Sequence, residues 1–435
     1  MSAVASCAAP ATGKQDPPAI KWDEKLEVAS GNGYRGPWRM NRSLFDYVDD
    51  PTVAIDEQGS IWVAWVDQPR QDIFLQVYGP DGKRRFDQPT NVSKSPRIFS
   101  WLPRMVIAPS DAGDIYVLWQ EIVFSGGSHG GEIFFARSTD GGRTIGVPIN
   151  LSNSIAGDGK GRLTPRYWHN GSLDLAISPQ GDLYAAWTEY EGHLWVARSR
   201  DRGKSFSDPL LVAGGPNAKP SRAPTLAISA GGAVHLAWTV GEHKAANIQF
   251  AMSVDRGQSF RAPRSVVESD GHADAPKIAV DGQGLIHLVY AESPLGPFDR
   301  YHIRYAPLSA EGRALEAPRE ISGPLPLQSQ SAGFPNLSLD GDNNIYVTWE
   351  LFASRRGYPE GMGLITSSDG GQTFGSPSII PGSADPALGV NGSQQGLLMR
   401  KLAVSEAGAI AVVNSTFKKD QASHIWLIRG QATAR

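Results

Sequence analysis

The sequence lacks the features that mark membrane-spanning, metal-dependent and nucleic-acid-binding proteins. Its apolar runs are far shorter than the roughly 18 residues that a membrane-spanning helix needs, which excludes such a helix. Lys and Arg number 41 against 44 Asp and Glu, and the net charge of -3 argues against a general nucleic-acid binder. There is no His-x-x-x-His pair, no Asp-rich calcium loop, no cysteine cluster and no glycine-rich phosphate loop before a helix. We therefore expect neither a metal nor a cofactor.

Cysteine occurs once, as Cys7, which excludes an intramolecular disulfide. The stretch Val4-Ala5-Ser6-Cys7 resembles the lipobox that ends a bacterial lipoprotein signal, although few residues precede it. We expect residues 1–19 to be a signal remnant or flexible tether. Either the true start of translation lies upstream of Met1, or the match to the lipobox is chance. The resemblance implies an exported lipoprotein of the bacterial periplasm or outer membrane, in contact with a membrane only through a lipid anchor at Cys7.

Turn-forming and bulky residues are abundant, with 48 Gly, 31 Pro and 12 Trp. Two short apolar strands joined by a glycine turn recur along the chain, as in "PTVAIDEQGSIWVAW" from Pro51 and "APTLAISAGGAVHLAW" from Ala223. Such alternating runs bounded by glycine turns are typical of β-strands. Six of these units end in a large aromatic: Trp65, Trp119, Trp187, Trp238, Tyr290 and Trp349. His235 and His287 replace another aromatic of the second strand, and we expect both to pack in the core.

Each unit continues with a third strand, a turn and a fourth strand, which is the pattern of a propeller blade. We predict an all-β, seven-bladed β-propeller of four-stranded antiparallel blades, as a single domain over residues 20–435 and as a monomer. Six blades is the alternative. The seventh unit, from Met399, has only three strands. We expect "KLEVAS" from Lys25, which resembles "PLLVAG" from Pro209, to supply the fourth and close the ring.

The turn between the third and fourth strands is repeated four times as Ser-x-Asp-x-Gly-x-Thr/Ser, as in "SSDGGQTF" from Ser367. An Asp carboxylate can accept N–H bonds within its own turn and glycine allows positive φ, so these turns are predicted to be structural. They resemble the Asp-box of the bacterial neuraminidase repeat, and the chain resembles the sialidase-like propeller superfamily. The resemblance implies that the turns lie on the face away from the substrate. Their aspartates are Asp140, Asp201, Asp255 and Asp369.

Carboxylates and arginines recur on the other face, where second strands end and innermost strands begin. Such a ring suits an acidic or polyhydroxylated sugar, because a guanidinium can bind a carboxylate through two hydrogen bonds. Glu121, Glu189 and Glu292 end equivalent strands, so we expect them to line one central volume and to be catalytic in a hydrolase. The predicted substrate-binding residues are Asp67, Arg104, Arg166, Arg222 and Arg400. The family resemblance implies a sialidase-type exo-glycosidase that acts on acidic glycans.

Two other functions fit the same sequence. "TPRYWHNG" from Thr164 places Arg166 beside Tyr167 and His169 on one long loop, with His129 and His272 in other loops. A uronate-directed polysaccharide lyase neutralises a carboxylate with Arg and moves the adjacent proton with His or Tyr, so Tyr167 and His169 are further catalytic candidates. A non-catalytic propeller that binds a glycan or a protein needs no catalytic set, and the fold alone assigns no activity.

Overall fold

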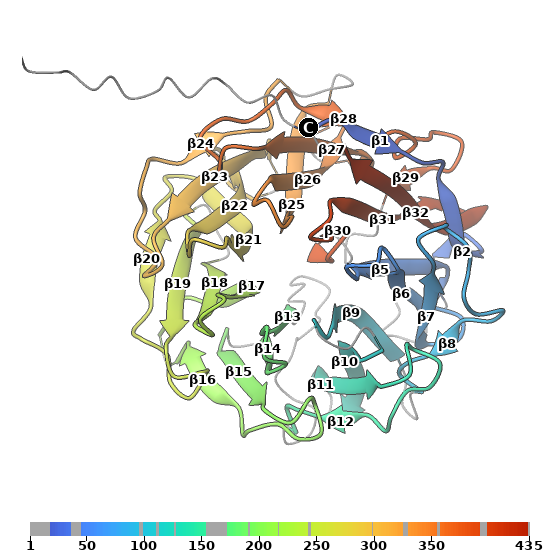
Figure 1. Cartoon of the computed structure of the whole chain (residues 1–435), viewed down its shortest axis with the longest axis horizontal. Helices are drawn as coiled ribbons and strands as arrows, with labels where there is room; N and C mark the ends of the chain where they lie inside the picture. The colour runs from blue at the N-terminus through green and yellow to red at the C-terminus, as the bar shows by residue number, and fades with distance from the viewer. Residues whose placement is uncertain are drawn as a thin grey trace, which may run out of the picture.

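The computed structural model is built from β-strands throughout the part of the chain that it describes (Figure 1). That part comprises residues 18–35, 45–94, 99–109, 113–125, 128–153, 172–189, 192–215, 217–241, 245–297, 299–324, 329–354, 357–391 and 398–433. Within these ranges no helix is long and apolar enough to cross a membrane. Residues 1–17 of the predicted tether, with Cys7, lie outside them.

Seven antiparallel sheets follow one another around a ring, so the prediction of seven blades is confirmed and the alternative of six is wrong. Blade 1 contains β5 (Val48–Ile55), β6 (Ile61–Asp67), β7 (Asp72–Tyr78) and β8 (Thr90–Asn91). Blade 2 contains β9 (Phe99–Ile107), β10 (Ile115–Ser125), β11 (Ser128–Ser138) and β12 (Ile149–Asn150). Blade 3 contains β13 (Leu173–Ile177), β14 (Leu183–Thr188), β15 (Leu194–Ser199) and β16 (Leu210–Ala213). Blade 4 contains β17 (Ser221–Ile228), β18 (Val234–Val240), β19 (Asn247–Ser253) and β20 (Arg264–Val267).

The remaining strands complete the ring. Blade 5 contains β21 (His272–Val280), β22 (Ile286–Ser293), β23 (His302–Leu308) and β24 (Arg319–Glu320). Blade 6 contains β25 (Ser331–Leu339), β26 (Ile345–Phe352), β27 (Pro359–Ser367) and β28 (Ser378–Ile379). Blade 7 contains β29 (Val390–Asn391), β30 (Leu402–Val404), β31 (Ala409–Lys418) and β32 (Ala422–Ala432), joined by β1 (Ile20–Trp22) and β2 (Leu26–Gly31). A separate two-stranded sheet is formed by β3 (Tyr34–Arg35) and β4 (Phe45–Asp46).

Blade 7 is closed by strands from both ends of the chain, as predicted from "KLEVAS". β2 pairs with β32 in an antiparallel ladder that places Leu26 opposite Leu427. β1 extends the same edge and places Ile20 opposite Ala432. Backbone hydrogen bonds between strands about 400 positions apart in the sequence therefore hold the ring shut.

The hydrophobic core lies between the faces of neighbouring blades. The second strands are buried almost end to end, because each blade packs against one neighbour on either side. The aromatics that end these strands carry much of this burial: Trp119 and Trp238 are 0% exposed and Trp187 is 1% exposed. Withdrawing one large apolar side chain from water contributes roughly 3 kcal/mol, so the repeated aromatic position stabilises the packing of the six blades that carry it.

A β-bulge interrupts the innermost strand of five blades at an Xaa-Pro step. The residue before the proline has a positive φ of 48° to 54°, and the strand register shifts at the same point. These residues are Asp50, Leu102, Ala223, Ala275 and Phe334. The inserted residue reverses which face of the strand the following side chains lie on, so the residue after the proline faces the central channel. Four of the residues brought there are Arg104, Thr225, Lys277 and Asn336.

Each copied Asp turn is closed by its own side chains. In blade 4, Asp255 Oδ1 accepts the N–H of Ser259 at 2.9 Å, and the hydroxyl of Ser253 accepts the N–H of Gly257 at 2.8 Å. The same bonds recur in the other three turns. Gly257 has a φ of +76°, and a Cβ there would lie 2.8 Å from the ring of Tyr184 in blade 3. The glycine thus lets each turn lie flat against the preceding blade.

Candidate functional site

The two faces of the ring carry different strand ends. We call the upper face the one at which the innermost strand of each blade begins and the second strand ends. The Asp turns follow the ends of the third strands and therefore lie at the opposite, lower face. All predicted substrate-binding and catalytic residues that the structure describes are on the side of the upper face or in the channel.

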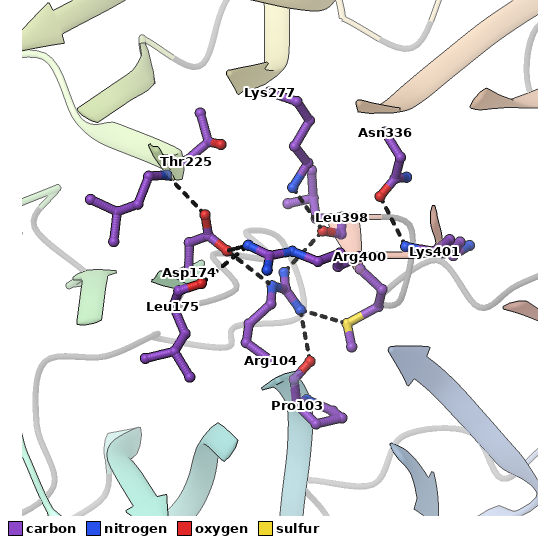
Figure 2. A network of polar contacts seen from close by, with 12 residues as sticks. Pro103, Arg104, Asp174, Leu175, Thr225, Lys277, Asn336, Leu398, Arg400 and Lys401 are labelled. Atoms are coloured by element: carbon purple, nitrogen blue, oxygen red, sulfur yellow. Dashed lines mark hydrogen bonds and ion pairs between the residues drawn. The ribbon is translucent and has the colours of Figure 1, made fainter. Parts of the chain in front are cut away.

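Four charged side chains from four blades form a cluster in the central channel, the channel cluster: Arg104, Asp174, Lys277 and Arg400 (Figure 2). Arg400 donates to Asp174 Oδ1 at 3.1 Å, and Arg104 Nε lies 4.0 Å from the same oxygen. Arg104 Nη2 donates to the carbonyl oxygen of Leu398 at 2.9 Å, which also accepts from Lys277 Nζ at 3.4 Å. Burial lowers the pKa of Arg104 to about 10. Burial also lowers the pKa of Lys277 to about 7, although Asp174 opposes this.

Residues of the channel also tie neighbouring blades together. Asp174 Oδ2 accepts the N–H of Leu226 from blade 4 at 2.9 Å. Asn336 Oδ1 of blade 6 accepts the N–H of Lys401 in blade 7 at 2.9 Å, and the Thr225 hydroxyl makes a weaker contact of the same kind. Asp174 therefore serves as a structural acceptor as well as a counter-ion.

A second group of side chains lies at the upper face between blades 4 and 5, and we call it the upper-face cluster: Arg222, His272, Asp274 and Tyr301. Arg222 Nη2 lies 3.3 Å from Asp274 Oδ2 and 3.2 Å from His272 Nε2. The ring of Tyr301 stands edge-on to that of His272, with centroids 6.2 Å apart. Arg222 is the second residue of β17, His272 begins β21, Asp274 lies within β21, and Tyr301 directly precedes β23.

Charge and exposure differ within the upper-face cluster. The side chain of Arg222 is 27% exposed and that of Asp274 is 21% exposed, whereas His272 is buried. Asp274 also accepts from the Thr239 hydroxyl of blade 4 at 2.9 Å. Although burial opposes it, Arg222 and His272 hold the pKa of Asp274 far below its usual range. Arg222 Nε is buried and has no hydrogen-bond partner among the described residues.

The predicted catalytic glutamates make contacts of different kinds. Glu292 accepts from the Ser269 hydroxyl at 2.7 Å and pairs with Arg304 Nε at 3.1 Å. Glu189 lies in the turn before β15, 3.7 Å from His193 Nδ1, and Glu121 is buried within blade 2. The prediction that arginines from the innermost strands face these glutamates needs correction. Arg104, Arg222 and Arg400 contact aspartates of the innermost strands instead: Arg104 and Arg400 lie near Asp174, and Arg222 pairs with Asp274.

Asp67, which was predicted to bind substrate, closes the turn between β6 and β7. Its Oδ1 accepts the N–H of Arg70 at 3.1 Å. Burial raises the pKa of Asp67, and Arg70 opposes that shift. Polar residues that open the third strands behave similarly, because they tie that strand to the following segment. Examples are Asp72 with the Ser93 hydroxyl at 2.6 Å and His302 with Glu320 at 2.9 Å.

Three predicted site residues, Arg166, Tyr167 and His169, lie outside the described residues, and their roles stay predictions. The backbone of His129 belongs to β11 and that of His272 begins β21, so both were wrongly placed in loops. The sequence pattern indicated Arg222 and His272 but not Asp274 and Tyr301. A signal was present: "RAP" at Arg222 and "DAP" at Asp274 put opposite charges at one repeat position of adjacent blades.

Comparisons with known proteins agree with this architecture. No known family profile matches the sequence, and no curated protein matches it significantly. Among solved structures, an ulvan lyase of a new polysaccharide lyase family, bound to -[GlcA(1-4)Rha3S]-, is 13% identical, with a TM-score of 0.58 over 92% of this chain and 95% of that one. The polysaccharide lyase Uly1 is 11% identical, with a TM-score of 0.55 over 95% and 100%. An α-L-arabinanase of Penicillium chrysogenum with arabinobiose is 14% identical, with a TM-score of 0.52 over 75% and 92%. At these identities the likeness establishes the shared propeller fold.

Proposed function

We propose that this protein acts on acidic glycans and that the upper-face cluster is the centre of a uronate-directed polysaccharide lyase. The observation that carries the proposal is the position of Arg222, a partly exposed guanidinium with an unused buried donor, beside His272 and Tyr301. A guanidinium binds a carboxylate through paired hydrogen bonds, and His and Tyr are the residues that exchange protons in such reactions. The folds of two polysaccharide lyases and an arabinanase are consistent with a glycan as ligand.

The reaction would be a β-elimination at a uronate. Arg222 binds the carboxylate and withdraws charge from it, which acidifies the proton on the neighbouring carbon. Tyr301, placed against His272 and acting as its phenolate, takes that proton and becomes the neutral phenol, and the electron pair forms a carbon–carbon double bond. The bond from the ring to the glycosidic oxygen breaks, and the departing oxygen receives a proton from the acid form of the same pair. His272 positions Arg222 through its 3.2 Å contact and is itself too buried to be the first choice of base.

A sialidase-type hydrolysis, which the family resemblance implied, is less well supported by the described residues. It requires three arginines available to one substrate carboxylate. Arg104 is only 3% exposed, and it donates to two backbone carbonyls and contacts Asp174. Arg400 is committed to that aspartate as well. The predicted glutamates Glu121, Glu189 and Glu292 remain candidates for hydrolysis only if a substrate reaches them.

Binding without turnover is the second candidate function. It is favoured by the pairing of Arg222 with Asp274, because a guanidinium already neutralised by a carboxylate stabilises developing charge less well. A non-catalytic propeller could hold an acidic glycan at the same place through the partly exposed guanidinium of Arg222 and the aromatic ring of Tyr301. The two candidates share a ligand and differ in whether a bond is broken.

The experiment is to incubate the protein with a panel of uronate-containing polysaccharides and to record the ultraviolet absorbance of the new double bond. A lyase produces this signal, and Arg222→Lys and Tyr301→Phe each lower its rate by at least about 100-fold with unchanged melting temperature. Arg256→Lys is the matched control, because Arg256 pairs with Asp182 at the lower face. Release of reducing ends without the double bond would indicate a hydrolase. Binding of uronate oligosaccharides by calorimetry with neither product would indicate the second candidate, and no binding at all would contradict the proposal.

A further inference from the structure

The channel cluster holds more positive than negative charge. Arg104, Lys277 and Arg400 reach it from three directions, and Asp174 is the carboxylate in contact with two of them (Figure 2). Asp50 adds a second negative charge that acts on Arg104 from blade 1. With Lys277 protonated, these five groups together leave one positive charge uncompensated. A like-charged cluster in partly dehydrated surroundings is unfavourable unless a counter-ion joins it.

Donor groups of the cluster are also left over. Arg104 Nε is buried, has no hydrogen-bond partner among the described residues, and belongs to a side chain that is 3% exposed. Lys277 Nζ carries up to three N–H groups, and among the described residues it donates to the Leu398 carbonyl oxygen at 3.4 Å. A buried donor without an acceptor costs about 1–3 kcal/mol, which an acceptor in the channel would recover.

We propose that the channel cluster is a binding site for one small monovalent anion, of halide or carboxylate chemistry, held by Lys277 Nζ and the guanidinium groups of Arg104 and Arg400. Arg104 and Lys277 already share the Leu398 oxygen, and Arg104 and Arg400 share Asp174 Oδ1, so the three cationic groups converge on the same two acceptors. Access is possible from the channel, because the Arg400 side chain is 32% exposed. The site uses none of the residues of the upper-face cluster, so it stands or fails independently of the proposed function.

Anion binding in this place has a defined pH dependence. The groups that face Lys277 are Asp174, Arg104 and Arg400, and with burial they leave its pKa at about 7. An anion binds the protonated amine better than the neutral amine, so binding raises that pKa and takes up a proton near neutrality. The affinity should therefore be highest below pH 7 and fall as the pH rises above it.

The test is to measure the melting temperature of the whole protein in sodium bromide, sodium formate and sodium gluconate at equal ionic strength, at pH 6 and pH 9. We expect bromide or formate to raise it saturably by about 1–3 °C over the bulky gluconate at pH 6. The rise should be smaller at pH 9 and lost in Lys277→Met. Lys25→Met, which removes a lysine paired with Asp385 in blade 7, should keep the response. Arg222→Lys should also keep it.

A second measurement does not depend on a variant. Wild-type crystals soaked in bromide should show an anomalous peak within about 3.5 Å of Lys277 Nζ, and formate should displace it. Bromide alone would identify a halide site, and displacement by formate would extend it to carboxylates. Equal melting temperatures in bromide, formate and gluconate, or crystals without a bromide peak in the channel, would overturn the proposal.

Discussion

Removing the charge of Lys401 should destabilise the propeller more than any change of an exposed lysine. Lys401 Nζ bonds Glu350 Oε1 between blades 6 and 7, and both side chains are 1% exposed. Asn414 Nδ2 donates to both oxygens of Glu350, at 2.9 and 3.2 Å. Lys401→Met would leave a buried carboxylate with only the amide as partner. Breaking a buried pair in this way costs about 3–5 kcal/mol.

The double variant Glu350→Met with Lys401→Met separates the cost of an unpaired buried charge from the cost of altered packing. It removes both ions and leaves Asn414 Nδ2 without its acceptor, at a cost of about 1–3 kcal/mol. The double variant should therefore be more stable than Lys401→Met alone. Denaturation midpoints in guanidinium chloride measure this order, with Lys83→Met at an 85% exposed lysine as the control that should not change. A Lys401→Met protein within about 1 kcal/mol of wild type would refute the reasoning.

Three further predictions concern the lower face and the core. Gly257→Ala should destabilise the fold by at least about 1 kcal/mol, because its Cβ would lie 2.8 Å from the Tyr184 ring at a φ of +76°. Urea denaturation midpoints measure this loss, and an unchanged midpoint would contradict it. Against the effect of burial, Ser205 lowers the pKa of Asp201 from 3.8 to about 2, so this contribution to stability is lost as the pH falls from about 4 to 2. Asp201→Asn should flatten acid unfolding in that range, and an unaltered slope would argue against it. Burial lowers the pKa of His235 from 6.5 to about 4, so the stability of the fold decreases as the pH drops through that interval. His235→Phe should remove this pH dependence, which is measured as melting temperature against pH.

The architecture was predictable because each blade is encoded locally. Strand, glycine turn, strand and aromatic lie within one short segment, and their repetition predicts both the blade and its neighbour. Trp187 and Trp238 are buried as their repeat position requires. His235 and His287 stack on Phe250 and Tyr305, respectively, as expected for members of an aromatic slot.

The candidate site was less predictable because its contacts cross between blades. Arg222 and His272 are about 50 positions apart, and their 3.2 Å contact depends on where the bulge places each strand. A period-two pattern assigns side chains to faces without allowing for an inserted residue, so it could not show that arginines of the innermost strands meet aspartates. Lys277 was missed for the same reason, since it follows the bulged Ala275-Pro276 step.

Because β1 and β2 pair with β32, the ring can close only after β32 has been synthesised. Leu26 pairs with Leu427, which the ribosome adds roughly 400 residues later. At 5–20 residues per second, the first strands emerge roughly 20–80 seconds before their partner exists. Six blades can form in that interval, while the backbone groups of β1 and β2 that will pair with β32 remain unpaired. Until its last strand is released, the chain therefore presents an unpaired sheet edge, which is the kind of surface that promotes aggregation.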